Sequence, residues 1–417
     1  MKKSLWFLFL TIFIDMLGIG ILVPVIPQLL GEPNSPYFLL AANQVDLGFI
    51  LLGILAAIYP LAVFFMAPIL GAMSDKYGRK PVLFISILGT ALSYFIFAYA
   101  IITKNIFLLF ASRLVDGITG GNISVAQAAI ADSTTQEHRT KAFGTMGAAF
   151  GLGFVFGPFL GGVLSTPAVL PFFNASTPFI FSGFLSLFNA FSIYFFFKES
   201  IKEKDTDRKV DLLGSFKNII KATKFSKQVQ MLFLCSFLFN AGLAFFYSFF
   251  NVYLTNKFDF SPADIGNFFA YVGVWIILTQ VIVVRYLAKR YKEVDLIGPA
   301  YIINAIGVLL YLIPDSFWYL LFIAPIVSMA NGVQMANFSS FLSKKIDEKV
   351  RGEVMGVSSS VASLGQALPP IFAGVLAAAT ATYIPIVFGA LVVFFAGFVF
   401  IYKVKKSDEE HYATIKI

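Results

Sequence analysis

The sequence predicts an all-α membrane protein with twelve transmembrane helices in two pseudo-symmetric six-helix halves. Three observations predict it: the composition, the length and charge pattern of the apolar runs, and an internal repeat. Of the 417 residues, 58% are apolar and 13% charged. A soluble domain of average composition carries about 25% charged residues, so most of this chain belongs in lipid.

Twelve apolar runs are each long enough to cross the hydrocarbon layer as a helix, which takes about 20 residues. The runs are too long for strands and lack a period of two, which argues against an outer-membrane barrel. The first run continues past Asp15 without a cleavage site, so it is a span and not a secretory signal. The predicted spans are 5–30, 46–73, 81–102, 105–131, 142–165, 176–197, 229–255, 262–284, 294–314, 316–342, 352–380 and 382–402.

Lys and Arg set the predicted orientation, because positively charged loops resist translocation. Of the 31 Lys and Arg residues, 28 lie at the N-terminus, in alternate loops, in the central segment or in the C-terminal tail. Lys104 and Lys257 lie on the opposite side, and Arg113 lies inside a span. We therefore expect a multi-pass protein of the cytoplasmic (inner) membrane with both termini in the cytoplasm. The net charge of +8 reflects this topology and does not indicate a nucleic-acid partner.

An internal repeat divides the chain. The predicted domains are an N-terminal bundle at 1–197, a cytoplasmic linker at 198–228, and a C-terminal bundle with a short tail at 229–417. In the linker, Lys209 to Lys224 has the spacing of a surface helix. Shifted by 212 residues, the halves match at Arg139 and Arg351, Gly144 and Gly356, Pro158 and Pro370, Gly162 and Gly374, and Leu109-Phe110 and Leu321-Phe322. Six-plus-six repeats are typical of transporters in which one half rocks against the other.

Three ionisable residues lie inside predicted spans: Asp15, Arg113 and Asp116. Each costs at least about 2.5 kcal/mol at the centre of the bilayer, which makes such residues candidates for function. Arg113 and Asp116 are three residues apart, so they share a helical face and can pair. A structural ion pair that only fixes packing is the alternative. We predict that all three carry proton coupling.

The fifth span is rich in glycine. Glycines four residues apart let helices approach closely in lipid, and a proline removes one backbone hydrogen bond. The residues that we assign to helix packing are Gly153, Gly157, Pro158 and Gly161. From physics alone, packing without any functional direction is the better interpretation.

The loop between spans two and three reads Gly71-Ala-Met-Ser-Asp75-Lys76-Tyr77-Gly78-Arg79-Lys80-Pro81. A tight turn at Gly78 places a carboxylate and several cations at helix ends, where charge-assisted hydrogen bonds can favour one of two bundle arrangements. This run resembles the loop signature of the major facilitator superfamily, and the resemblance implies the major facilitator fold. The glycine-rich run of span five resembles the motif of the antiporters in that superfamily, which favours export.

Within the superfamily, the first half is similar to the tetracycline/proton antiporters of the drug/proton antiporter branch. The similar residues are Ile14 to Pro27, Tyr59, Ala67-Pro68, Gly71 to Val82, Arg113 with Gly117 and Gly120, Ala131-Asp132 and Phe150 to Gly153. The resemblance implies that Gly71, Asp75, Gly78, Arg79 and Asp132 form an inner-side gate.

The chain differs from that family mainly in the positions of its acidic residues. The tetracycline antiporters carry acidic residues in spans three and nine where this chain has Ser93 and Asn304, and a histidine of span eight is absent. Asp116 replaces a small residue, and Arg285 and Lys292 stand where glycines of a second loop would sit. We therefore expect a proton route through Asp15 and Asp116, and a substrate that differs from tetracycline.

A polar set suited to a substrate cavity lies mainly in the second half, although interhelical hydrogen bonds would explain these residues equally well. The candidate cavity residues are Gln127, Asn240, Asn251, Gln280, Asn331, Gln334, Phe338 and Gln366. The 50 phenylalanines would suit an aromatic-bearing ligand, but most of these rings must face lipid or core.

Together these features predict a proton-coupled secondary active transporter that exports a small, amphipathic organic molecule, such as a drug-like compound or a metabolite. The alternatives are a proton-coupled uptake symporter and an exporter of one dedicated metabolite such as a siderophore. An enzyme is not expected, since no catalytic or phosphate-binding motif is present. One cysteine and two histidines argue against a metal site, and no cofactor is expected. The expected partners are the substrate, protons and the bilayer, with the protein as a monomer.

Overall fold

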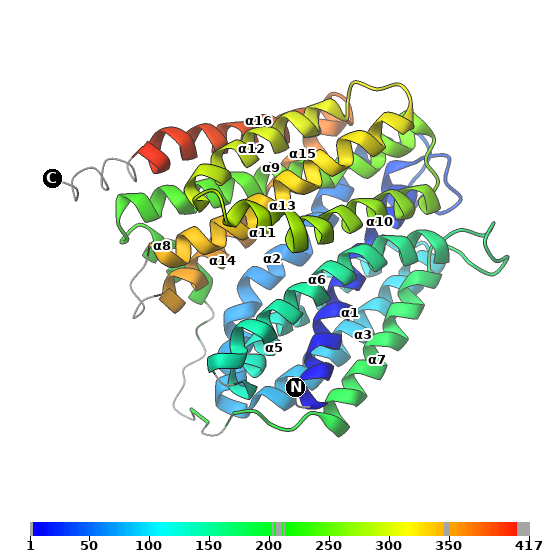
Figure 1. Ribbon diagram of the computed structural model, residues 1–417. Coiled ribbons are helices and arrows are strands. Elements are labelled where there is room, and N and C mark those ends of the chain that lie inside the picture. The colour runs from blue at the N-terminus through cyan, green and yellow to red at the C-terminus, as the bar shows by residue number, and fades with distance from the viewer. Residues whose placement is uncertain are drawn as a thin grey trace. The chain divides into compact units, whose positions relative to one another are not determined.

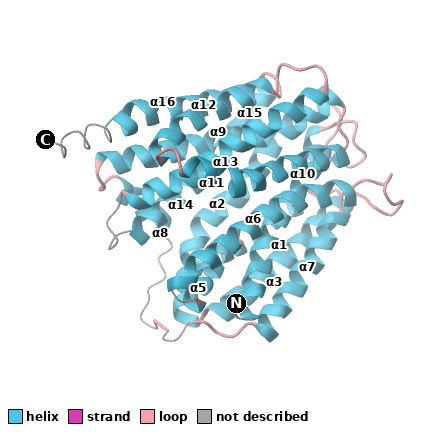
Figure 2. Ribbon diagram, viewed as in Figure 1, coloured by secondary structure: helices cyan, strands magenta, loops and turns pink. Residues whose placement is uncertain are grey.

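The predicted all-α fold is confirmed in a computed structural model, which describes residues 3–134, 136–201, 204–205, 211, 213–345 and 351–406. Every regular element in these ranges is a helix (Figure 2). Twelve segments are long and apolar enough to cross a membrane, as predicted. The chain is therefore a multi-pass membrane protein.

Contacts divide the chain into two compact units. Unit 1 contains Met1–Gly214 and Asp259–Gly273, and unit 2 contains Ser215–Phe258 and Val274–Ile417. Residues 259–273 fall in unit 1 because they pack on helix α6: a Cβ at Gly266 would lie 2.5 Å from the Pro158 carbonyl oxygen. The domain boundaries at 197, 198–228 and 229 stay a prediction about the repeat.

Unit 1 is built on seven long helices (Figure 1). They are α1 (Lys3–Ile26, extended by the π-turn Pro27–Gly31), α2 (Val45–Tyr77), α3 (Arg79–Ile102), α4 (Ile106–Thr119), α5 (Asn122–Ser133), α6 (Gln136–Leu164) and α7 (Thr177–Phe196). The first helix packs against α5, α6 and α7, so its middle is enclosed by protein. This enclosure buries Asp15, which is 8% exposed.

Close contact between α1 and α6 depends on the glycines of α6. A Cβ at Gly153 would lie 2.6 Å from the Met16 Cβ, and one at Gly157 would lie 2.6 Å from the Leu17 carbonyl oxygen. Gly161 lies in the same way against Ile21. Real Cβ atoms do not approach so closely, so side chains here would push the two helices apart.

The fourth span is broken where the sequence predicted one continuous helix. Helix α4 ends at Thr119 and α5 begins at Asn122. Gly120 and Gly121 have ψ angles of −6° and −1°, far from the helical value. Gly121 also approaches Ala67 of α2 too closely for a Cβ, at 2.9 Å. The break starts a new helix in the middle of the span.

Unit 2 contains the remaining helices, and α10 runs from unit 1 into it. They are α8 (Gly214–Ala222), α9 (Lys227–Phe258), α10 (Pro262–Leu278), the π-turn Thr279–Val283, α11 (Val284–Ala288), α12 (Glu293–Leu310), the 3-10 turn Phe317–Tyr319, α13 (Leu320–Lys344), α14 (Arg351–Ala367), α15 (Pro369–Ala379), α16 (Ile384–Val399) and the π-turn Phe400–Lys405.

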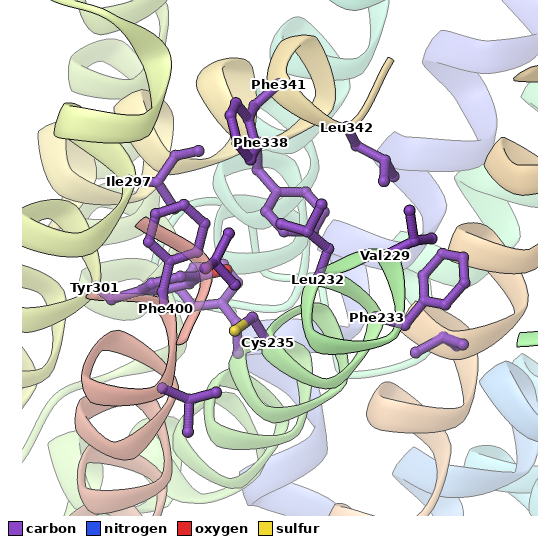
Figure 3. Close-up of a cluster of buried hydrophobic side chains, with 14 of the residues drawn as sticks. Val229, Leu232, Phe233, Cys235, Ile297, Tyr301, Phe338, Phe341, Leu342 and Phe400 are labelled. Carbon is purple, nitrogen blue, oxygen red and sulfur yellow. The ribbon is translucent and has the colours of Figure 1, made fainter. Parts of the chain in front are cut away.

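An aromatic and aliphatic cluster forms the core of unit 2 (Figure 3). Phe338 and Phe341 of α13 meet Leu232 of α9, Tyr301 of α12 and Phe400 there. The predicted cavity residue Phe338 is therefore part of this core, with 7% of its surface exposed. Phe338 lies four residues after Gln334 on α13, a spacing that does not distinguish a cavity from a core.

The predicted linker helix appears as α8, which begins at Gly214; most of the residues between Lys209 and Leu213 lie outside the described ranges. Ser215, Ile219 and Ala222 lie on one side of α8, and the last two pack against the core of unit 2. Phe216 and Ile220 on the other side are exposed. The helix is amphipathic, with one apolar face docked.

Candidate functional site

The candidate site begins with Asp15, which lies buried in the first span of unit 1. Its Oδ1 atom accepts a hydrogen bond from the side-chain amide of Asn122, with 3.4 Å between the heavy atoms. Its Oδ2 atom is buried and has no hydrogen-bond partner among the described residues. An ionised carboxylate is costly in such a position, whereas a protonated one is tolerated more easily.

Arg113 and Asp116 form a buried ion pair on α4. The Arg113 Nη1 atom donates to Asp116 Oδ2 over 2.7 Å, and the two side chains are 8% and 5% exposed. The guanidinium also lies over the ring of Tyr59 from α2, 4.8 Å from its centroid. Tyr59 in turn packs on Gly117 and Gly120, which leave room for its backbone and ring. These contacts hold the guanidinium in one place.

The pair and Asp15 belong to one cluster. Asp116 is close enough to act electrostatically on Asp15, and Ser93 of α3 is within hydrogen-bonding reach of Asp116. The Tyr94 hydroxyl lies against Gly18, one turn beyond Asp15 on α1, where a Cβ would clash with it. Five helices of unit 1 thus bring two carboxyls and one guanidinium together, away from water.

Three of the residues predicted to form an inner gate, Asp75, Arg79 and Asp132, contact one another within unit 1. Arg79, the first residue of α3, lies 2.7 Å from the Asp75 carboxylate and 3.0 Å from the Asp132 carboxylate. Its guanidinium also donates to the Ser74 hydroxyl. One buried guanidinium therefore joins the end of α2, the start of α3 and the end of α5.

Two of the predicted gate residues near the turn between α2 and α3 are glycines. The structure gives a reason for glycine at position 78 but not at position 71. Gly78 has a φ of 110°, and a Cβ there would lie 2.5 Å from the Glu199 carboxylate. Both the backbone and the neighbour therefore require glycine. A Cβ at Gly71 would meet no atom of the described residues within 4 Å.

Glu199 is a part of this region that sequence reasoning missed. Its carboxylate, just after α7, accepts hydrogen bonds from the backbone N–H groups of Arg79 and Lys80, at 3.0 and 3.1 Å. These N–H groups begin α3 and have no partner within the helix. A negative charge is favourable at this end of a helix. An acid in the charged linker gave no signal of this contact, because the partner lies 120 residues away.

The candidate cavity residues of unit 2 make several hydrogen bonds within that unit. In unit 2, the Gln366 amide donates to Asn240 over 3.0 Å, and Gln334 donates to the Tyr301 hydroxyl over 3.1 Å. Asn331 lies within hydrogen-bonding reach of Tyr247.

Gln280, Asn251 and Gln127 complete the set. Gln280 donates to the Gly332 carbonyl over 3.4 Å. Asn251 is buried, and its Oδ1 atom has no hydrogen-bond partner among the described residues. In unit 1, Gln127 is half-buried on α5.

Sequence reasoning also missed Asn122 and Tyr94. Asn122 stands next to the Gly120-Gly121 pair, and a polar residue directly after paired glycines in an apolar span was the available signal. No sequence signal pointed to Tyr94, because a tyrosine in a span usually lies at the interface between lipid and water. In the described ranges, no three His, Cys, Asp or Glu side chains gather as metal ligands would.

The profile of the Major Facilitator Superfamily matches residues 8–313 and, in a second match, 232–415. The chain belongs to the Major Facilitator Superfamily. The predicted family and the predicted absence of an enzyme activity are thereby confirmed, since the members that it resembles are transporters.

Among curated superfamily proteins, the chain is similar to the class H tetracycline resistance protein of Pasteurella multocida, with 31% identity over 89% of this chain and 88% of that protein. It is 28% identical to multidrug resistance protein 1 of Bacillus subtilis (strain 168), over 89% of each chain.

Among solved structures, the human organic anion transporter MFSD10 (TETRAN) has a TM-score of 0.69 and 22% identity, covering 96% of this chain and 99% of that chain. PepTSo, a POT family transporter, has a TM-score of 0.74 and 12% identity over 99% of each. These two likenesses concern the fold alone.

Proposed function

We propose that this superfamily member is a proton-coupled antiporter that exports a small, amphipathic organic molecule by alternating access. One observation carries the proposal: the buried carboxyls Asp15 and Asp116 lie in one cluster, and the guanidinium of Arg113 pairs with Asp116. Arg113 pairs with Asp116, so the charge of Asp15 is not compensated by a cation. A proton on Asp15, or a substrate that replaces it, relieves this imbalance.

The cycle follows from competition for Asp15. When Asp15 is protonated, the cluster carries no net charge and is compatible with a dry environment. When a substrate with positive or hydrogen-bond-donating groups binds nearby, it stabilises the ionised carboxylate and releases the proton. Proton and substrate therefore exclude each other, which is the requirement for antiport.

The position of Asp116 supports this assignment. Ser93 stands where the tetracycline antiporters carry an acid, and it lies within hydrogen-bonding reach of Asp116. The carboxyl has thus moved from α3 to α4 but stays at the same place in the bundle. Asn304, which stands at the second such position, is fully buried in unit 2. A proton route through unit 1 is therefore the one we favour.

The relatives favour export of drug-like compounds, because tetracycline and multidrug resistance proteins are among them. The altered acids argue for a substrate other than tetracycline. We further propose a monomer in the bacterial cytoplasmic membrane with both termini in the cytoplasm. The residues Gly71, Asp75, Gly78, Arg79 and Asp132 would form the inner gate. The polar side chains of unit 2, with Gln127, would meet the substrate.

Inverted membrane vesicles test the direction of transport. With an acidic interior, we expect accumulation of a lipophilic cation such as ethidium, and its release when an ionophore collapses the pH gradient. Vesicles without the protein serve as the control. Uptake into right-side-out vesicles, driven by external acid, would instead support the symporter. If neither cations, tetracyclines, polycarboxylates nor siderophore-like acids are moved, the export proposal fails.

A further inference from the structure

We propose that unit 2 carries its own gating clamp, made of Glu293, Asp295, Lys344 and Lys405, in which the charges of the unit 1 clamp are exchanged. By clamp we mean side chains from two helix ends that hold the first turn of a third helix. The inference rests on the proposed transport cycle and adds gating residues to it.

In unit 1, the clamp holds the start of α3. Its first turn carries the guanidinium of Arg79. It also carries the backbone N–H groups of Arg79 and Lys80, which have no partner within the helix. Asp132, near the end of α5, binds the guanidinium over 3.0 Å. Glu199, after the end of α7, binds the two N–H groups. Carboxylates from two helix ends thus hold a positive helix start.

In unit 2, the corresponding contacts hold the start of α12. Its first turn presents the carboxylates of Glu293 and Asp295. Lys344, the last residue of α13, forms an ion pair with Glu293, which also accepts a hydrogen bond from Ser340 over 3.0 Å. Lys405, at the end of the α16 span, lies 2.8 Å from Asp295. Cations from two helix ends thus hold a negative helix start.

The repeat places one of these contacts, Arg79–Asp132 and Glu293–Lys344, at nearly corresponding positions. The offset of 212 residues carries Asp132 onto Lys344, and Arg79 falls two residues before Glu293. The helices correspond as well, since α3 and α12 form the third span of each half and α7 and α16 form the sixth. The glycine loop is lost in unit 2, yet a helix start held by two helix ends is retained with opposite signs. The side-chain pair Arg79–Asp132 of unit 1 thus corresponds to Glu293–Lys344 of unit 2 with the charges exchanged.

The side chains of the unit 2 clamp are partly exposed to solvent, which allows their ion pairs to open and close. The side chains of Lys344 and Glu293 are 66% and 25% exposed, and those of Lys405 and Asp295 are 31% and 39% exposed. Ion pairs at this exposure stabilise by little, so they break and reform readily. The Arg79 side chain is 9% exposed, so the clamp of unit 1 is the stronger one.

Charge exchange between Glu293 and Lys344 tests the proposal in reconstituted liposomes. The variant Lys344→Glu faces Glu293 with a second carboxylate, and Glu293→Lys does the reverse. We expect each to slow substrate exchange by about fivefold, because the pair is lost and two like charges then face each other. Substrate affinity, measured by fluorescence quenching in detergent, should stay within about twofold. The double variant Glu293→Lys/Lys344→Glu keeps the total charge and should recover the rate.

Two further variants separate the clamp from general effects of charge. Asp315, in the loop before α13, pairs with Lys257 of α9. The variant Asp315→Lys breaks this pair and should leave the rate of substrate exchange unchanged. Glu293→Gln removes the unit 2 pair without creating repulsion and should slow exchange less than Lys344→Glu. If Lys344→Glu exchanges at the wild-type rate, or if the double variant is as slow as the single ones, the clamp is refuted. Failure of the wild-type protein to move protons or substrate would instead refute the proposed function.

Discussion

Asp15 and Asp116 are both buried carboxyls, but their partners differ. Asp116 has a guanidinium at 2.7 Å, while Asp15 has one amide at 3.4 Å and a second oxygen without a partner in the described residues. Removing Arg113 would leave Asp116 as an unpaired buried charge, which costs about 3–5 kcal/mol. Asp15 already lacks such compensation, which makes it the group whose proton is most easily exchanged for a substrate contact.

The shift of a carboxyl from α3 to α4 can be tested by moving it back. The variant Asp116→Ser should lose proton-coupled transport, because Arg113 then has no carboxylate. The double variant Ser93→Asp/Asp116→Ser places a carboxyl on the helix that carries one in the tetracycline antiporters. We expect it to regain at least about a tenth of the wild-type transport rate in inverted vesicles. An inactive double variant that is folded and inserted would show that the place of the carboxyl on α4 is essential.

At the residue scale, the sequence was informative about charges inside the spans and poor about partners that are distant in the chain. Asp15, Arg113 and Asp116 were identified because charge in lipid is rare and costly. Asn122, Tyr94 and Glu199 could not be assigned, because their roles depend on contacts with residues far away in the chain. The spacing of three that pairs Arg113 with Asp116 is local, and that pair was predicted.

At the scale of elements, the close contact between α6 and α1 depends on glycines of α6, which have no Cβ atom. A Cβ at Gly157 would lie 2.6 Å from the Leu17 carbonyl oxygen and 2.8 Å from the Gly20 Cα. We expect Gly157→Ala to destabilise the protein by about 1–3 kcal/mol, the usual cost of overpacking. Thermal unfolding in detergent would measure the loss.

Gly147 provides a matched control on the same helix. A Cβ at Gly147 would meet no described atom within 4 Å, so Gly147→Ala should unfold at the wild-type temperature or slightly above it. Equal stability of the two variants would mean that α6 does not pack on α1 as described.

The broken fourth span shows where element prediction fails. Apolar runs define where a span lies but not whether its helix is continuous. One helical period continued from Arg113 across residues 120–121 would place Ser124 and Gln127 beside the Arg113 face. Because Gly120 and Gly121 interrupt the helix, that extension does not hold beyond Thr119. Two adjacent glycines in a polar stretch of a span were the signal for the break.

Across the whole molecule, the fold was predictable because lipid imposes simple rules. Span length, the absence of strands and the distribution of Lys and Arg follow from the thickness and chemistry of the bilayer. The repeat then gave six spans in each half. The sequence did not reveal that residues 259–273 pack with the first unit, or that unit 2 retains a clamp with exchanged charges, because both depend on tertiary contacts.

The central claim is that Asp15 carries the exchanged proton. Substrate-dependent proton flux in liposomes, followed with an interior pH dye, tests it most directly. Asp46→Asn, at an exposed acid at the start of α2, is the matched control. We predict flux for the wild-type protein and for Asp46→Asn, and none for Asp15→Asn, although the last is folded and inserted. Undiminished flux through Asp15→Asn would contradict the account.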